Sequence, residues 1–227
     1  QQAFRVLGMI QYQRVADLKS GEANLRKAIQ LKPDDDDAQY HLGALLMEKK
    51  EWRQASSAFE AAIKIKPDHA EAHLRLGRAQ EILEKYDRAQ EAYRESIKAN
   101  ARRPEAYNAL GSLYMRFEKY PHAAQVLKNA IENNPEYAPN YRDLGLVYKE
   151  QQRFPDAIRQ LEKARLLDPG NATVLFNLGM TYIAAKDGAK ALDNLRAYLS
   201  RRTAREDPIR VSTARDIIAR LEKLAPR

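Results

Sequence analysis

Cysteine is absent from the 227 residues of the chain, and its absence excludes several classes of site at once. A chain without thiols has no disulfide framework, no cysteine nucleophile and no cysteine-ligated zinc, and it suits both the cytosol and a periplasm. Long apolar runs are also missing, because no stretch approaches the roughly 20 uncharged apolar residues that span a bilayer. We therefore predict that the visible sequence is soluble and has no membrane span.

The first residues lack the basic-then-apolar order of a signal peptide. Helical periodicity nevertheless already includes Gln1. We therefore expect that an upstream segment was removed, and such a segment would hold any anchor or export signal. The compartment, cytoplasmic or periplasmic, stays open.

Residues that carry chemistry are sparse as well, and the chain has four histidines. His69 and His73 are four residues apart, a spacing that can hold a metal on a helix, but no third and fourth ligands are obvious. His41 and His122 have no Ser or Cys partner at a recognisable catalytic spacing, and no glycine-rich loop joins a strand to a helix. The sequence predicts no metal site, no cofactor and no enzymatic activity.

The net charge of +8 is unevenly distributed. Residues 201–227 hold eight Arg and Lys against four Asp and Glu, which is half of the total excess. Such a basic tail could contact nucleic acid or an anionic surface, but nucleic-acid binding usually also needs a basic stripe with exposed aromatic residues. The aromatic residues here fall on expected core positions, so nucleic acid is the weaker interpretation.

Glycine is infrequent, with nine residues, but five of the nine recur every 34 residues, each directly after a leucine. These are Gly43, Gly77, Gly111, Gly145 and Gly179. Three residues after each glycine stand Leu46, Gln80, Tyr114, Tyr148 and Tyr182. A second aromatic series comprises Trp52, Tyr86, Tyr120 and Phe154, with Gly188 as the exception. Alanines follow at Ala55, Ala89, Ala123, Ala157 and Ala191.

A 34-residue period with apolar residues at helical spacing predicts a repeated pair of helices. Glycine inside a helix costs about 1 kcal/mol relative to alanine, so a glycine in every repeat indicates that a neighbouring helix approaches closely. Pro121 and Pro155 directly follow aromatic residues and suit the first turn of the second helix, where a missing N–H is tolerated.

These residues resemble the tetratricopeptide repeat family, whose unit is a 34-residue helix-turn-helix. The clearest unit carries Tyr107, Leu110, Gly111, Tyr114, Tyr120, Ala123, Leu127, Ala130 and Pro135. The resemblance implies an all-α, right-handed superhelical solenoid of antiparallel helix pairs. We expect an array over residues 1–205, with a degenerate unit at 1–35 and repeats at 36–69, 70–103, 104–137, 138–171 and 172–205. Residues 206–227 are expected to form a C-terminal capping helix, with Asp207 as N-cap and Ile209, Ala214, Ile217, Ile218, Leu221 and Leu224 as its apolar stripe.

In the family, the first helices of the repeats line a concave groove that binds partners. Carried over to this chain, that groove is expected to hold Arg75, Arg78, Asn108, Arg116, Arg142, Leu146, Lys149, Phe176, Asn177, Met180 and Ile183. Charges of both signs alternate along the middle of the array, and Glu71 with Arg75 at i, i+4 should neutralise each other. The last repeat differs because its groove positions are uncharged, which predicts an apolar anchor around Phe176, or burial of these side chains by the capping helix.

We therefore expect a non-enzymatic scaffold that binds a peptide segment or partner protein in this groove, with no small-molecule substrate. A role in assembling a bacterial envelope, pilus or secretion complex would suit the sequence. The alternative is a structural module for self-association or for docking of a larger chain, and the oligomeric state stays open. Nucleic-acid or anionic-surface binding through the basic tail is the weaker alternative.

Overall fold

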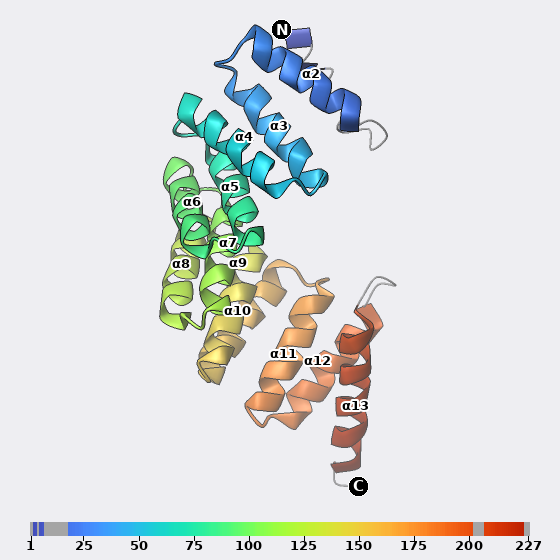
Figure 1. Cartoon of the computed structure of the whole chain (residues 1–227). Coiled ribbons are helices and arrows are strands. Elements are labelled where there is room, and N and C mark those ends of the chain that lie inside the picture. Colours follow the sequence, from blue (N-terminus) through green and yellow to red (C-terminus); the bar gives the residue numbers. More distant parts are fainter. Residues whose placement is uncertain (1, 4, 7–17, 202–206, 225–227) are drawn as a thin grey trace. The chain divides into compact units, whose positions relative to one another are not determined.

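A computed structural model describes the chain except for residues 1, 4, 7–17, 202–206 and 225–227 (Figure 1). The described part contains α-helices and short turns and no strand, which confirms the predicted all-α class. The helices are α2 (Leu18–Leu31), α3 (Asp36–Glu48), α4 (Trp52–Ile65), α5 (Ala70–Ile82), α6 (Tyr86–Ala99), α7 (Pro104–Arg116), α8 (Tyr120–Asn133), α9 (Ala138–Glu150), α10 (Phe154–Leu167), α11 (Ala172–Ala184), α12 (Gly188–Arg201) and α13 (Pro208–Leu224).

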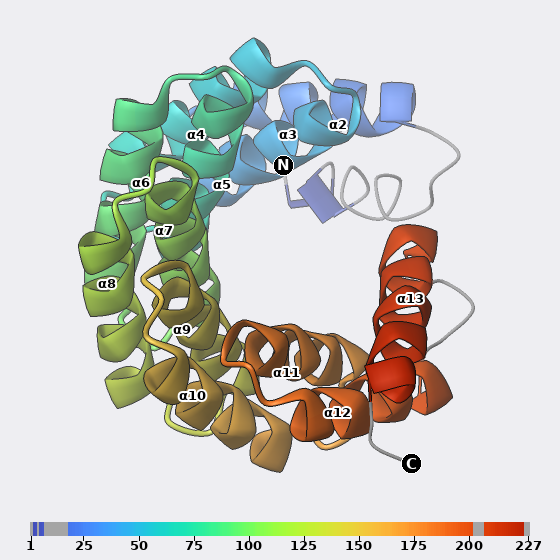
Figure 2. The same cartoon turned by 90° about the horizontal axis from the view of Figure 1, so that it is seen from below.

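The chain forms two compact units, Gln1–Leu113 and Tyr114–Arg227, and each is described by itself. In the first unit, α3 and α5 lie in one layer and α4 and α6 in another (Figure 2). The second unit has the same arrangement, with α9 and α11 in one layer and α10 and α12 in the other. We call these layers the first-helix face and the second-helix face of each unit.

The helix pairs follow the predicted period. First helices begin at Asp36, Ala70, Pro104, Ala138 and Ala172, each 34 residues after the last. Second helices begin at Trp52, Tyr86, Tyr120, Phe154 and Gly188, so the aromatic series marks their first residue. Several first helices have side-chain caps, because Asp35, His69 and Asn171 accept hydrogen bonds from the backbone N–H groups of Ala38, Ala72 and Val174.

The glycine series lies where two helices of a pair meet. A Cβ atom on Gly77 would overlap the ring of Tyr93, and one on Gly145 would lie 2.7 Å from Cγ of Leu161. Gly43 and Gly179 are similarly close to Phe59 and Leu195. These distances confirm the close helix approach that the glycine series predicted for Gly77 and Gly145.

The predicted degenerate unit is described in part. Leu7 and Gly8, which defined its first helix, lie outside the described residues. In α2, Leu25 and Ala28 are fully buried, and Leu25 belongs to a hydrophobic cluster with Leu42, Leu45 and Phe59. The helix α2 therefore packs on the first repeat as a second helix would.

The capping helix α13 packs against α12 at the end of the second unit (Figure 1). The backbone N–H of Ile209 donates to Asp207 Oδ1 at 2.9 Å, as expected for an N-cap. Ala214 is fully buried in a hydrophobic cluster with Leu195 and Tyr198 of α12, and Ile217 and Ile218 pack against this cluster.

The predicted apolar stripe of this helix is wrong at one position. Ile209 is 72% exposed, whereas Val211, which was not predicted, is 9% exposed and joins the cluster. The reason is geometric, because Val211 and Ala214 are three residues apart and face α12 together, while Ile209 lies in the first turn on another side. The side chain of Leu224 lies outside the described part.

The capping helix also accounts for the exception at Gly188. A Cβ atom on Gly188 would lie 3.3 Å from Cδ2 of Leu221, so a side chain of α13 lies where other repeats place an aromatic residue. We expect that Gly188→Tyr, although it completes the aromatic series, displaces α13 and lowers the free energy of unfolding by about 1–3 kcal/mol through overpacking. Thermal denaturation measures the loss, and Ala189→Tyr at the exposed neighbouring position is the control. Equal melting temperatures for the two variants would contradict the contact with Leu221.

Candidate partner-binding face

The predicted groove residues fall in both units and occupy their first helices. Arg75, Arg78 and Asn108 belong to the first unit. Arg116, Arg142, Leu146, Lys149, Phe176, Asn177, Met180 and Ile183 belong to the second. Whether these residues bind a partner stays a prediction, and the structure shows what each can offer.

Charged side chains on the first-helix face of the first unit form ion pairs. Arg75 Nε donates to Glu71 Oε1 at 2.9 Å, which confirms the predicted i, i+4 pair. The guanidinium of Arg103 also pairs with Glu71. Burial raises the pKa of the nearby Tyr40, and the Glu71 carboxylate raises it further. Because the single carboxylate of Glu71 neutralises only one of its two guanidinium partners, these three residues together keep one net positive charge, weakened by the pairing.

The second unit brings charged and uncharged residues together on neighbouring first helices. Arg142 Nε donates to Asp143 Oδ1 at 2.7 Å, and Lys149 Nζ lies 3.3 Å from Glu150 Oε1, so the cations of α9 have partners on their own helix. The adjacent helix α11 contains no charged residue from Ala172 to Ala184. The face therefore changes from paired charges on α9 to an uncharged surface on α11.

Leu146 and Met180 are equivalent residues of these two helices, one 34-residue period apart. Their helices contact each other, so the two residues occupy the same repeat position on neighbouring helices of the first-helix face. Both are partly exposed, and neither is among the residues of the two clusters that the described part of this unit shows. They form the apolar row of the face.

Phe176, which the sequence placed at the centre of the anchor, has structural contacts of its own. Its ring packs against Tyr198 with centroids 5.2 Å apart, and the guanidinium of Arg210 in α13 lies 5.8 Å from its centroid. It packs against the cluster that α13 covers. Ile183 likewise packs against a core cluster. For Phe176, these contacts favour the alternative in which the capping helix covers the side chain.

The histidines do not form the pair considered from the sequence. His73 is buried, with Nε2 2.8 Å from the carbonyl oxygen of Pro67, while His69 caps α5 through Nδ1. His69 does lie near Asp36 and Asp37, close enough for one atom of each to share an ion. Asp37 already pairs with Arg5 at 2.9 Å, and exposed acidic groups of this kind are common without metal. The contacts of this cluster are therefore those of helix starts, where His69 caps α5 and Asp37 of α3 forms an ion pair.

The fold and the face can now be compared with known proteins. Residues 23–205 match the family model of the tetratricopeptide repeat protein 21 C-terminal ARM domain. The chain belongs to this family of tetratricopeptide-type helical repeats. No curated protein matches the sequence.

Solved structures of other tetratricopeptide repeat proteins share the fold. YrrB, described as a TPR protein with an unusual peptide-binding site, is 21% identical over 85% of this chain and 97% of its own, with a TM-score of 0.64. The pilF protein of Pseudomonas aeruginosa is 21% identical over 85% of this chain and 92% of its own, with a TM-score of 0.67. MamA is 26% identical over 70% of this chain and 94% of its own, with a TM-score of 0.63.

The repeat family accounts for the regular features of the chain and highlights its departures. The described helices include none long and apolar enough to cross a membrane. Sequence reasoning assigned the core and the first-helix face, but it missed two pockets on the second-helix faces. One of these pockets could have been suspected from the sequence, because Gln80 stands at a repeat position, three residues after the glycine, that otherwise holds Tyr or Leu.

Proposed function

We propose that this tetratricopeptide-type chain is a non-enzymatic scaffold that binds a segment of a partner protein on the first-helix face of its second unit. The observation that carries the proposal is that α11 has no charged residue and that its Met180, like Leu146 of the neighbouring α9, is a partly exposed apolar residue. A partly exposed apolar strip on a polar surface is typical of a site that takes apolar side chains from a partner. The similarity to YrrB, described as having a peptide-binding site, supports a peptide ligand.

The structure refines the ligand expected from the sequence. Arg142 and Lys149 were expected to favour acidic residues beside the apolar anchor. Their pairing with Asp143 and Glu150 lowers the net positive charge, so we propose that apolar contacts on Leu146 and Met180 carry most of the affinity. Asn177, on the same uncharged helix, offers a polar contact to the backbone of an extended peptide.

The absence of cysteine makes a direct test of this face possible. A single cysteine at Met180, labelled with a photo-crosslinker, should capture the partner in lysate of the source cell, and a cysteine at Lys163 on the second-helix face is the matched control. Mass spectrometry then identifies proteins captured at Met180 and absent at Lys163. Identical captures at both positions would contradict the proposed face.

With the partner identified, we expect Met180→Asp to weaken binding by about 30-fold, the loss typical of a hot-spot side chain, while the melting temperature changes little. Phe176→Asp should instead lower the melting temperature, because its ring packs against Tyr198. Isothermal titration and thermal denaturation of both variants separate the two roles. Wild-type affinity of Met180→Asp would show that the apolar row does not bind the partner.

Self-association or docking within a larger chain is the alternative from another functional class. Sedimentation of the purified chain distinguishes it, because a concentration-dependent dimer that Met180→Asp abolishes would place a second copy on this face. The assignment of the partner to an envelope, pilus or secretion complex stays a prediction from the sequence. In the described part of the basic tail, Arg210 lies over Phe176 and Glu222 pairs with Arg196 of α12, so nucleic-acid binding through this tail stays the weaker alternative.

A further inference from the structure

The second-helix face of the first unit contains a pocket of about 410 Å³ between α4 and α6, with α5 as its floor. Ile63, Leu76 and Ala92 provide apolar walls. Glu60, Lys64, Arg88, Glu91 and Glu95 surround the walls with charges of both signs. The pocket lies entirely within the first unit, on its second-helix face.

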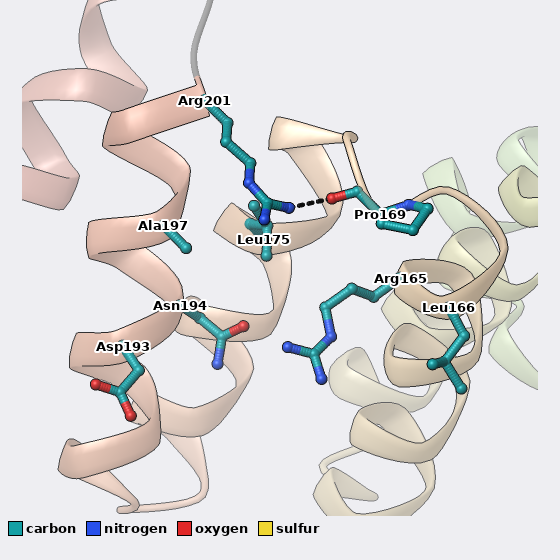
Figure 3. A pocket seen from close by; sticks show the side chains of 8 residues that line it. All are labelled: Arg165, Leu166, Pro169, Leu175, Asp193, Asn194, Ala197 and Arg201. Carbon is teal, nitrogen blue, oxygen red and sulfur yellow. Dashed lines mark hydrogen bonds between the residues drawn. The ribbon is translucent and has the colours of Figure 1, made fainter.

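The second unit has an equivalent pocket of about 320 Å³ between α10, α11 and α12 (Figure 3). Three repeat periods, or 102 residues, relate the two, so that His73 corresponds to Leu175 and Ala92 to Asn194. The first pocket continues along α5 to Gln80, whereas the second does not reach the equivalent residue, Tyr182.

Tyr182 shows what normally fills this end of the groove. It is buried, its hydroxyl donates to Glu162 Oε1 at 3.3 Å, and the ammonium of Lys190 lies 5.5 Å from its ring centroid. The same three positions in the first unit hold Gln80, Glu60 and Arg88. The first unit therefore keeps the carboxylate and the cation that surround Tyr182 in the second unit, but it has no tyrosine ring between them.

Gln80 itself has an unsatisfied hydrogen-bonding group. Its side chain is 2% exposed, and its Nε2 donates to Ser56 Oγ at 2.8 Å, while its Oε1 has no hydrogen-bond partner among the described residues. If the amide were turned over, Ser56 could donate to Oε1, but Nε2 would then lose its partner. One polar atom of Gln80 is therefore unpaired in either orientation, which is rare for a buried group.

We propose that this pocket binds the side chain of a tyrosine from a partner protein, whose ring takes the place that Tyr182 fills in the second unit. The hydroxyl would hydrogen-bond with the free amide atom of Gln80 or with Glu60, and Arg88 would lie over the ring as Lys190 lies over Tyr182. Three carboxylates against two cations at the rim disfavour anionic aromatic ligands and leave the neutral phenol. This site extends the chain's interactions to a second face and is independent of the first-helix face.

The test is a titration of the full chain with N-acetyl-tyrosinamide, followed by amide chemical shifts in NMR spectra. We expect shifts confined to residues around Ser56, Gln80 and Arg88, with affinity in the millimolar range that is typical of a single side chain. N-acetyl-phenylalaninamide, which lacks only the hydroxyl, should bind about tenfold more weakly, the effect of losing one hydrogen bond to a buried group. Equal binding of both probes, or no shifts at this site, would overturn the proposal.

Two variants make the test specific. Gln80→Tyr supplies the phenol from the chain itself and should abolish the shifts without lowering the melting temperature, because Ser56 is smaller than its equivalent Ile158 and leaves room for the ring. The double variant Tyr182→Gln with Ile158→Ser, which reproduces both Gln80 and Ser56, should create a second site of the same kind in the second unit. Should Gln80→Tyr fail to fold, the new shifts in this double variant still decide, and their absence in a folded double variant would overturn the proposal. Neither result depends on binding at Met180, so the two faces are tested separately.

Discussion

Gly145→Val is expected to lower the free energy of unfolding by about 1–3 kcal/mol, the usual cost of overpacking a well-packed core. A Cβ atom at this position would lie 2.7 Å from Cγ of Leu161 and 3.1 Å from the backbone oxygen of Ala157. Leu161 is fully buried and a backbone oxygen cannot turn aside, so relief requires that α9 and α10 move apart. Urea denaturation followed by circular dichroism measures the loss.

A matched pair of alanine variants isolates the cause. Alanine is the better helix former by about 1 kcal/mol, so Gly145→Ala would stabilise a helix that had space for a methyl group. We expect it to destabilise the chain instead, while Gly170→Ala, where the nearest atom to a new Cβ is 3.9 Å away, should have little effect. A more stable Gly145→Ala would show that helix contact is not the reason for the glycine.

Coupling to the facing residue provides a second control. Leu161→Ala alone should cost about 2–5 kcal/mol because it leaves a cavity. Combined with Gly145→Val, it should cost less than the sum of the two single variants, because the valine methyl groups enter the space that Leu161 vacates. Strict additivity would mean that the two side chains do not share this space.

Removal of residues 207–227 is expected to lower the melting temperature and the solubility of the chain. The helix α13 covers Leu175, Leu195 and Tyr198, which are at most 2% exposed. Exposing even one such side chain costs about 1.5–3 kcal/mol, and for a chain of this size each kcal/mol corresponds to about 2–4 °C. Terminal units of repeat arrays need a polar outer surface for solubility, so the truncated chain should also aggregate.

A point substitution tests the same contact without removing any residues. Ala214 is fully buried against α12, so Ala214→Glu places a carboxylate in an apolar cluster and should detach α13. Ser212→Glu, at an exposed position of the same helix, is the control and should leave the melting temperature nearly unchanged. Fluorescence of a dye that binds exposed apolar surface should rise for the first variant alone. If α13 were a loose basic arm, both variants and the truncation would be as stable as the wild type.

Local pattern was sufficient to predict the helix pairs of this protein. The 34-residue spacing of leucine, glycine, aromatic residues and alanine determines which residues of each helix are apolar and where each helix begins, because helical periodicity is a property of neighbouring residues. The paired charges of Glu71 and Arg75 were predictable for the same reason, since residues four apart lie on one face of a helix.

Contacts between distant residues were decided by the tertiary structure alone. The sequence placed Phe176 at the centre of a partner site, but the packing of α13 brings Arg210 and Tyr198 against its ring. Gly188 breaks the aromatic series, and the reason lies 33 residues away in Leu221. Gln80 is visible in the sequence as a substitution, but only the packing of α4, α5 and α6 shows that it leaves a pocket and a buried amide oxygen with no hydrogen-bond partner among the described residues. Periodicity specifies which side of a helix is buried, whereas the identity of what covers that side depends on residues that the chain brings together from afar.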